Sequence, residues 1–306
     1  MNATDPRRAA LVGLAAYFVT SVFWGANMPL TAIILRVLDP FWMTPWRLTI
    51  ATATLLLLVL ATEGAGALRM PIPWRRTLLM GLAIASFFVT YNVGLRYTNV
   101  ITAAAFMAGS PVYAAVTLRL LTGAKLEPGF WIAAPLTLLG AGIAVYGRSL
   151  SSGQAVDIQG GEPLIVLCIV QWTVYSILAQ RWFGPAHGQL RRTYVASVGG
   201  LPWVFAAWAT AWAIGWVGPP NLAPDGETVM WLVLTSVLAT AIAGVTWNIG
   251  ASRLGIAVGS LWQNAVPVFG VLISMLFAIY PTREQVVGGA IVVAGVLYMQ
   301  WRKMRA

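Results

Sequence analysis

Residues 91–113, YNVGLRYTNVITAAAFMAGSPVY, return in altered form as residues 247–269, WNIGASRLGIAVGSLWQNAVPVF. A shift of 156 positions, without a gap, aligns six pairs: Asn92 with Asn248, Gly94 with Gly250, Phe106 with Trp262, Pro111 with Pro267, Val112 with Val268, and Tyr113 with Phe269. Asparagine and proline are scarce inside apolar segments, so their joint recurrence is informative. The match indicates a duplicated structural unit.

The composition around this repeat excludes a water-soluble fold. The chain has 306 residues, of which 59% are hydrophobic and only 9% charged, and its mean hydropathy is +0.77. A soluble domain carries roughly a quarter charged residues. The apolar residues form runs of about twenty, the length that crosses a bilayer as a helix. We therefore predict an all-α integral membrane protein with ten transmembrane helices at residues 9–35, 41–62, 75–96, 98–121, 128–147, 163–183, 191–216, 227–249, 254–279 and 283–301.

Ten helices and one duplication predict two five-helix units, residues 1–150 and 151–306. Because five is an odd number, the second unit enters the membrane from the side opposite the first. The two units are then inverted repeats, related by a pseudo-two-fold axis in the membrane plane. This arrangement is typical of secondary transporters, whose binding site lies near the middle of the bilayer.

The distribution of basic residues predicts the orientation. With ten spans, fourteen of the nineteen bases fall on the side of the two termini: Arg7, Arg8, Arg69, Arg75, Arg76, Arg119, Lys125, Arg181, Arg191, Arg192, Arg253, Arg302, Lys303 and Arg305. The other side carries five bases and six acids. By the positive-inside rule both termini are cytoplasmic. The net charge of +10 thus reflects topology, and we expect no nucleic-acid partner.

Several motifs resemble one known family. They are Phe23–Asn27 (FWGAN), Arg47, Gly94–Thr98 (GLRYT), Ser110–Val112 (SPV), Leu138–Gly140 (LLG), Asn264–Val268 (NAVPV) and the segment from Gly288 to Gly295. In order and spacing they resemble the EamA-type proteins of the drug/metabolite transporter superfamily, and within it the YddG-type amino-acid exporters. The resemblance implies a carrier of the bacterial inner membrane that exports small metabolites. Residues 171–175, QWTVY, depart from the run of small residues that many relatives have here, which leaves the substrate open.

Candidate binding residues are the polar and aromatic side chains within the predicted spans. A solute crossing the bilayer needs hydrogen-bonding partners where lipid offers none. Apolar contact with a few orienting amides suits an amphipathic solute of amino-acid size. The candidates are Asn27, Tyr91, Met107, Tyr113, Gln171, Trp172, Tyr175, Trp247, Trp262, Gln263 and Asn264. Each has a structural alternative, because such side chains also bond helix to helix.

Pro111 and Pro267 occupy equivalent places near the centres of the fourth and ninth predicted spans. Proline lacks an amide hydrogen and displaces the carbonyl four residues earlier, here that of Met107 or Gln263. Paired interruptions of this kind are a sequence pointer to a transporter site. We predict a kinking and gating role for both prolines, with a simple packing kink as the alternative.

The scarcity of ionisable groups restricts the chemistry. No Asp or Glu lies deep in a predicted span, and the chain has one cysteine, Cys168, and one histidine, His187. We therefore predict no enzyme activity, no metal and no cofactor, and transport without a buried carboxylate relay. Arg47 is the one base clearly beyond a loop; snorkelling outward is the favoured reading, and contact with a substrate carboxylate is the alternative.

The sequence thus predicts a carrier that exports small amphipathic metabolites, most simply aromatic or neutral amino acids, by alternating access around a central cavity. An exporter of drugs or other metabolites is the alternative within the superfamily. A channel and an intramembrane enzyme fit less well. The expected partners are a small-molecule substrate and the lipid bilayer, and we expect a monomer.

Overall fold

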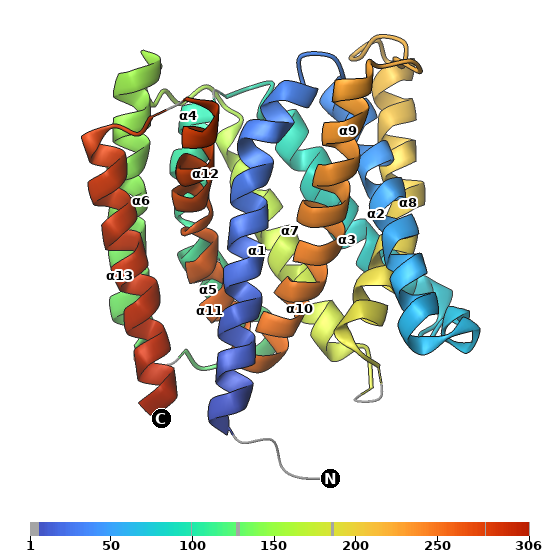
Figure 1. Ribbon diagram of the computed structural model, residues 1–306, viewed down its shortest axis with the longest axis horizontal. Coiled ribbons are helices and arrows are strands. Elements are labelled where there is room, and N and C mark those ends of the chain that lie inside the picture. The colour runs from blue at the N-terminus through green and yellow to red at the C-terminus, as the bar shows by residue number, and fades with distance from the viewer. Residues whose placement is uncertain (1–5, 99, 127–128, 185–186, 279, 306) are drawn as a thin grey trace.

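The computed structural model describes residues 6–98, 100–126, 129–184, 187–278 and 280–305. Across these ranges every regular element is a helix (Figure 1). In chain order they are α1 (Pro6–Ile34), α2 (Pro40–Glu63), η1 (Ala65–Leu68), α3 (Trp74–Gly94), α4 (Val100–Ala108), α5 (Ser110–Thr122), α6 (Phe130–Ser152), α7 (Glu162–Arg181), α8 (Gln189–Ala213), α9 (Gly226–Thr235), η2 (Ser236–Ile242), α10 (Ala243–Leu254), α11 (Ile256–Gln263), α12 (Val266–Ser274), η3 (Met275–Phe277) and α13 (Arg283–Arg305).

Eight helical segments in the described ranges are long and apolar enough to cross a membrane, or nine if the bent pair α4 and α5 forms one span. The prediction of an all-helical membrane protein is therefore confirmed. The helices follow the ten predicted segments in order, and α13 covers the last of them. The count of ten crossings stays a prediction.

Three of the predicted spans are interrupted, for reasons visible in the sequence. The fourth is divided at Gly109 into α4 and α5, which are bent by 49°. The ninth is divided after Gln263 into α11 and α12. Pro111 and Pro267 each occupy the second position of the new helix, where a missing amide hydrogen costs no helical bond. The eighth contains a π-helical stretch, η2, between α9 and α10.

The helices pack in reciprocal pairs. The first helix of each predicted unit lies along the third helix of the other unit, α1 along α10 and α3 along α7. The second helices, α2 and α8, pack together, and so do the fifth, α6 and α13 (Figure 1). The main helix contacts are therefore made between the two predicted units, so neither unit forms a closed bundle without the other.

Glycines bring some of these pairs into backbone contact. A Cβ atom on Gly81 of α3 would collide with the backbone of Gly199 in α8, and one on Gly199 would collide with the carbonyl oxygen of Thr77. On the far side of the molecule, a Cβ on Gly288 of α13 would collide with the carbonyl oxygen of Gly140 in α6. Small residues allow such close approach in membrane proteins, where packing replaces the hydrophobic effect as the force between helices.

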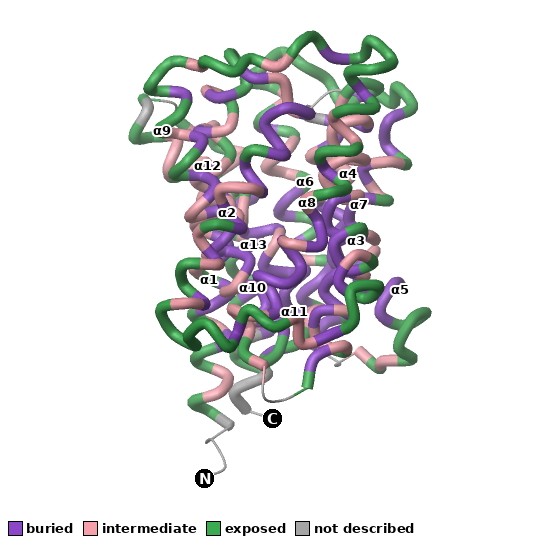
Figure 2. The backbone as a smooth tube through the Cα atoms, turned by 90° about the vertical axis from the view of Figure 1, so that its right-hand side faces the viewer, coloured by how far each residue is buried: buried purple, intermediate pink, exposed green. Residues whose placement is uncertain are grey.

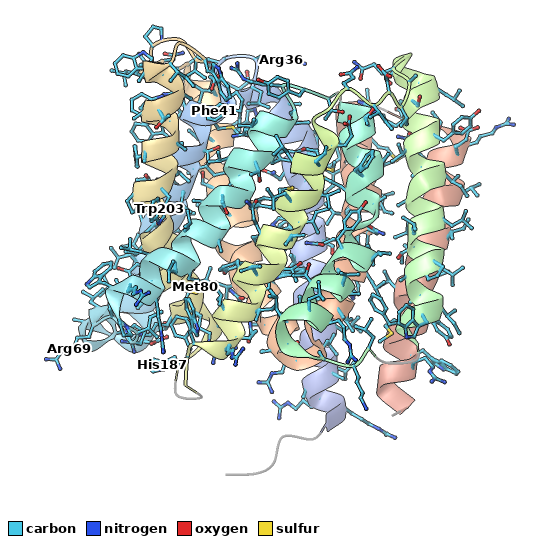
Figure 3. The ribbon with its side chains drawn as sticks, turned by 180° about the vertical axis from the view of Figure 1, so that it is seen from behind. Arg36, Phe41, Arg69, Met80, His187 and Trp203 are labelled. Carbon is cyan, nitrogen blue, oxygen red and sulfur yellow. The ribbon has the colours of Figure 1, made fainter. Side chains whose placement is uncertain are left out.

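The two ends of the bundle differ. The chain enters α1 and leaves α13 at the same end (Figure 1). Arg69 and His187 lie at this end, whereas Arg36 lies at the opposite one (Figure 3). Figure 2 shows the buried residues gathered in the half nearest the termini, with more intermediate and exposed residues in the other half. The helices therefore pack more tightly toward the termini.

Acidic side chains at the end opposite the termini are used to start helices. Asp39 accepts a hydrogen bond of 2.7 Å from the backbone N–H of Phe41 at the start of α2. Asp225 accepts from the backbone N–H of Thr228 at 2.9 Å and from its hydroxyl at 2.7 Å. These two bonds hold the pKa of Asp225 below its usual value. Both carboxylates act as N-caps.

Candidate substrate-binding site

Five rings from four helices form an aromatic cluster in the interior: Trp24 of α1, Phe87 of α3, Trp172 and Tyr175 of α7, and Trp247 of α10. Trp172 is at its centre and is 8% exposed. Its ring centroid lies 5.3 Å from that of Trp24, 5.5 Å from Phe87, 5.1 Å from Tyr175 and 5.5 Å from Trp247. Trp172, Tyr175 and Trp247 are sequence candidates. Trp24 belongs to the motif at residues 23–27 and was not a binding candidate, yet its ring contacts that of Trp172.

Hydrogen bonds fix most of the polar atoms of the aromatic cluster. Trp24 Nε1 donates to the carbonyl oxygen of Ala239 in η2 at 2.9 Å, and Trp247 Nε1 donates to Ser176 Oγ at 2.9 Å. Tyr175 Oη accepts from Asn248 Nδ2 at 2.9 Å. Tyr175 and Trp247 are almost completely buried, so they form the packed base of the cluster. Trp172 differs, because its buried Nε1 has no acceptor in the described ranges.

Polar and half-buried side chains adjoin this cluster on α3 and α7. The hydroxyl of Thr90 donates to Gln171 Oε1 at 2.6 Å. Tyr91 stacks on Phe87, with centroids 6.4 Å apart and planes 5° apart. Gln171 and Tyr91 both keep part of their surface accessible. The structure thus brings two further sequence candidates to the edge of the aromatic cluster.

The remaining candidates of the second unit lie at the broken helices. Asn264, which is buried, donates from Nδ2 to the carbonyl oxygen of Ala108 at 3.0 Å. Its Oδ1 accepts from Ser110 Oγ at 3.4 Å. The amide therefore satisfies a carbonyl that the break at Gly109 leaves without a helical partner. Trp262 is buried with its ring 6.5 Å from Phe18, and its Nε1 has no acceptor among the described residues.

Pro111 is buried. Four other candidates at these breaks retain accessible surface: Met107, Tyr113, Gln263 and Pro267. The Tyr113 ring lies against the backbone of Gly109, where a Cβ would come within 2.7 Å of Cζ. Nothing else in the described structure separates Met107 and Gln263 from the other residues at these breaks. The gating role of the two prolines stays a prediction.

Asn27 belongs to a chain of hydrogen bonds that leads to Arg47. Arg47 Nη2 donates to Thr31 Oγ1 at 2.8 Å, and Thr31 Oγ1 donates to Asn27 Oδ1 at 3.0 Å. Arg47 is only 7% exposed. The expectation that it snorkels outward is therefore wrong, because its guanidinium lies inside, against α1. Thr31 could not be identified from the sequence, because its role depends on this contact.

Seven buried side-chain polar atoms of the described residues have no partner, and three of them are donors at these positions: Trp172 Nε1, Trp262 Nε1 and Arg47 Nε. Buried donors are normally paired, and in a membrane protein each unpaired group is costly. Their natural complement is a solute rich in acceptors. Within the described part of the chain, no three His, Cys, Asp or Glu side chains gather as a metal site would require.

Comparison with known proteins identifies the architecture. The model of the EamA-like transporter family matches residues 11–146 and matches again at residues 159–301. The chain belongs to the EamA-like transporter family. The predicted membership of the drug/metabolite transporter superfamily is thereby confirmed.

Similar proteins span nearly the whole chain. The uncharacterized transporter YyaM of Bacillus subtilis is 24% identical over 278 residues, which cover 90% of each chain. The aromatic amino acid exporter YddG of Ancylobacter novellus is 25% identical over 290 residues, covering 94% of this chain and 95% of that one. A solved crystal structure with 23% identity superposes with a TM-score of 0.77 over 97% of this chain and 98% of the other, and shows the same fold. This EamA-family chain is thus a multi-pass membrane transporter.

Proposed function

We propose that this EamA-family protein exports small amphipathic metabolites, specifically aromatic or neutral amino acids, across the bacterial inner membrane by alternating access. The aromatic cluster, with the unpaired donor of Trp172 at its centre, is the observation that carries the proposal. Ring faces accept an apolar side chain, and a few polar groups orient the solute. The similarity to an exporter of aromatic amino acids points the same way.

We further propose ten spans arranged as two inverted units, residues 1–150 and 151–306. The double match of the family model and the reciprocal packing of α1 on α10 and α3 on α7 support this arrangement. So does a recurring bond between the third and second helices of each unit. Asn92 Nδ2 donates to Thr44 Oγ1 at 3.4 Å, and Asn248 Nδ2 donates to Thr193 Oγ1 at 3.0 Å.

The substrate path opens, in this proposal, toward the end opposite the termini. Tyr91 stacks on Phe87 of the aromatic cluster yet keeps accessible surface, which supports an internal space beside the cluster. The looser packing of that half of the bundle supports the same direction (Figure 2). If the loosely packed half of the bundle closed and the tightly packed half loosened, the opening would move to the other face of the membrane.

Counterflow in proteoliposomes tests the transport activity. Vesicles loaded with an unlabelled aromatic amino acid should transiently accumulate the labelled one. Aromatic and neutral amino acids should compete with this uptake, and the uptake should need no pH gradient. The Trp172→Phe variant removes one donor while keeping a ring, and we expect its apparent affinity to fall roughly fivefold.

Trp131→Phe is the matched control, because Trp131 on α6 is 66% exposed, and it should transport like the parent protein. Absence of counterflow with every amino acid would overturn the proposal. Flux without stimulation from the opposite side would indicate a channel, and uphill accumulation driven by protons would contradict transport without a relay.

Labelling of single cysteines tests the proposed cytoplasmic location of the termini. In a Cys168→Ser background, which removes the only native cysteine, we expect Arg36→Cys to react with an impermeant maleimide in spheroplasts. Arg69→Cys, at the other end of the bundle, should react only in inverted vesicles (Figure 3). The reverse pattern would place the termini outside.

A further inference from the structure

Arg47 is a buried cation that has no acidic partner among the described residues. It is the eighth residue of α2, about 10 Å along the helix from its start. Among the described residues, the ion pair within 4.0 Å joins Arg191 to Glu63, at the opposite end of the bundle. Asp39, the acid nearest to Arg47 in the sequence, accepts a backbone hydrogen bond at the start of α2. No carboxylate of the described chain therefore neutralises Arg47.

The surroundings of the guanidinium leave most of its donors unused. Nη2 donates to Thr31 Oγ1 at 2.8 Å and lies 3.8 Å from the sulfur of Met43, while Nε has no acceptor in the described ranges. Met43 belongs to an apolar group with Ile34, Leu38, Trp42 and Leu232. A guanidinium offers five donors, and burial of a charge without a partner costs several kcal/mol. An anion at this position would remove that cost.

One face of α1 connects Arg47 with the aromatic cluster. Trp24, Asn27 and Thr31 are spaced by three and four residues, so they lie on the same side of the helix. Trp24 contacts Trp172 at one end of this face, and Thr31 contacts Arg47 at the other. Seven residues of helix correspond to about 10 Å. A solute of amino-acid size would reach from one to the other.

We propose that Arg47, positioned by Thr31 and Asn27, is the carboxylate-recognition site of the transporter. The solute is thus a carboxylate whose apolar group turns toward the aromatic cluster. Arginine suits this role because its planar fork pairs with both oxygens of a carboxylate. The inference rests on the proposed function and adds the chemical class that the substrate must carry.

Ligand-induced stabilisation of the purified protein in detergent tests the inference. Three probes share an indole ring: tryptophan, tryptophan amide, and indole-3-propionate, which has the carboxylate and no amine. We expect the wild-type protein to bind both carboxylates roughly 10- to 100-fold more tightly than the amide, and Arg47→Gln to remove this preference. Thr31→Val should reduce it in part. Arg36→Gln, which changes an exposed arginine at the same end of the bundle, should retain it in full.

Loss of the preference for carboxylate over amide separates recognition from a structural role, because a destabilised protein would bind all three probes more weakly. If wild-type protein and folded Arg47→Gln prefer carboxylate over amide equally, the inference is overturned and the proposed function stands. If Arg47→Gln does not fold, an unchanged preference for carboxylate in Thr31→Val and Arg47→Lys would overturn the inference. Binding of indole-3-propionate that depends on Arg47, without binding of tryptophan, would support the inference and overturn the amino-acid assignment. A wild-type protein that binds neither carboxylate would overturn both.

Discussion

Replacement of Gly199 by Leu is expected to abolish the folded protein. Gly199 in α8 lies against Thr77 and Gly81 of α3 with backbone touching backbone, so that even a Cβ atom has no room. Backbone cannot move aside as a flexible side chain can, and the two helices would have to separate. We expect a cost of at least about 3 kcal/mol and little monodisperse protein after detergent extraction. Size-exclusion chromatography of a fluorescent fusion measures this directly.

The chain supplies a matched control for this substitution. Gly142 also lies within a long helix, α6, but apart from the adjacent backbone of that helix no described atom lies within 4 Å of a Cβ built on it. Gly142→Leu should therefore give the yield and profile of the parent protein. Equal yields from the two leucine variants would show that α3 and α8 do not approach as closely as described.

Replacement of Asn248 by Leu is expected to destabilise the protein by about 2 to 4 kcal/mol. The side chain is 0% exposed. It donates to Tyr175 Oη at 2.9 Å and to Thr193 Oγ1 at 3.0 Å, and it accepts from Gln180 Nε2 at 3.4 Å. Leucine has nearly the same size but removes all three bonds, and it leaves Tyr175 Oη without a partner among the described residues. Thr193 still donates to the carbonyl oxygen of Gln189, and Gln180 to that of residue 248. Thermal unfolding in detergent should show a midpoint lowered by more than about 5 °C.

The equivalent asparagine of the first unit gives the comparison. Asn92 is half-buried, and its Nδ2 makes two long bonds of 3.4 Å, to Pro40 and Thr44. Long bonds near a partly accessible surface are weak, so Asn92→Leu should cost less than about 1 kcal/mol. A larger loss for Asn92→Leu than for Asn248→Leu would contradict the described hydrogen bonds.

Hydrophobic run length and proline chemistry were sufficient to predict much of the fold. Runs of about twenty apolar residues predicted the helices, since lipid demands that every backbone polar group be paired within the segment. The positions of Pro111 and Pro267, which recur at equivalent places in the repeat, predicted where two spans are interrupted, because proline fits best in the first turn of a helix. Proline alone does not mark a break, since continuous helices also contain Pro29, Pro45, Pro135 and Pro202. The π-helical stretch η2 had no comparable signal in the sequence; within it the carbonyl oxygen of Ala239 accepts a hydrogen bond from Trp24.

The candidate site was harder to predict, because the sequence does not reveal which side chains face one another. The aromatic residues were identified by type and depth, but the contact between Trp24 and Trp172 depends on α1 and α7 both packing against α10. For Arg47, depth in the helix predicted an outward-reaching side chain, since a charge avoids lipid. The hydroxyl of Thr31, sixteen residues away in another helix, provides an inward partner instead.

The bond between Asn264 and the carbonyl of Ala108 has a consequence for how the molecule would move. The two positions are 156 residues apart, the same offset that superimposes the repeated segments. In the proposed arrangement each partner is the other's counterpart, so the bond lies on the axis that exchanges the two units. When the two units exchange conformations, a contact between counterparts maps onto itself, so this bond can stay closed as a pivot while contacts farther from the axis change.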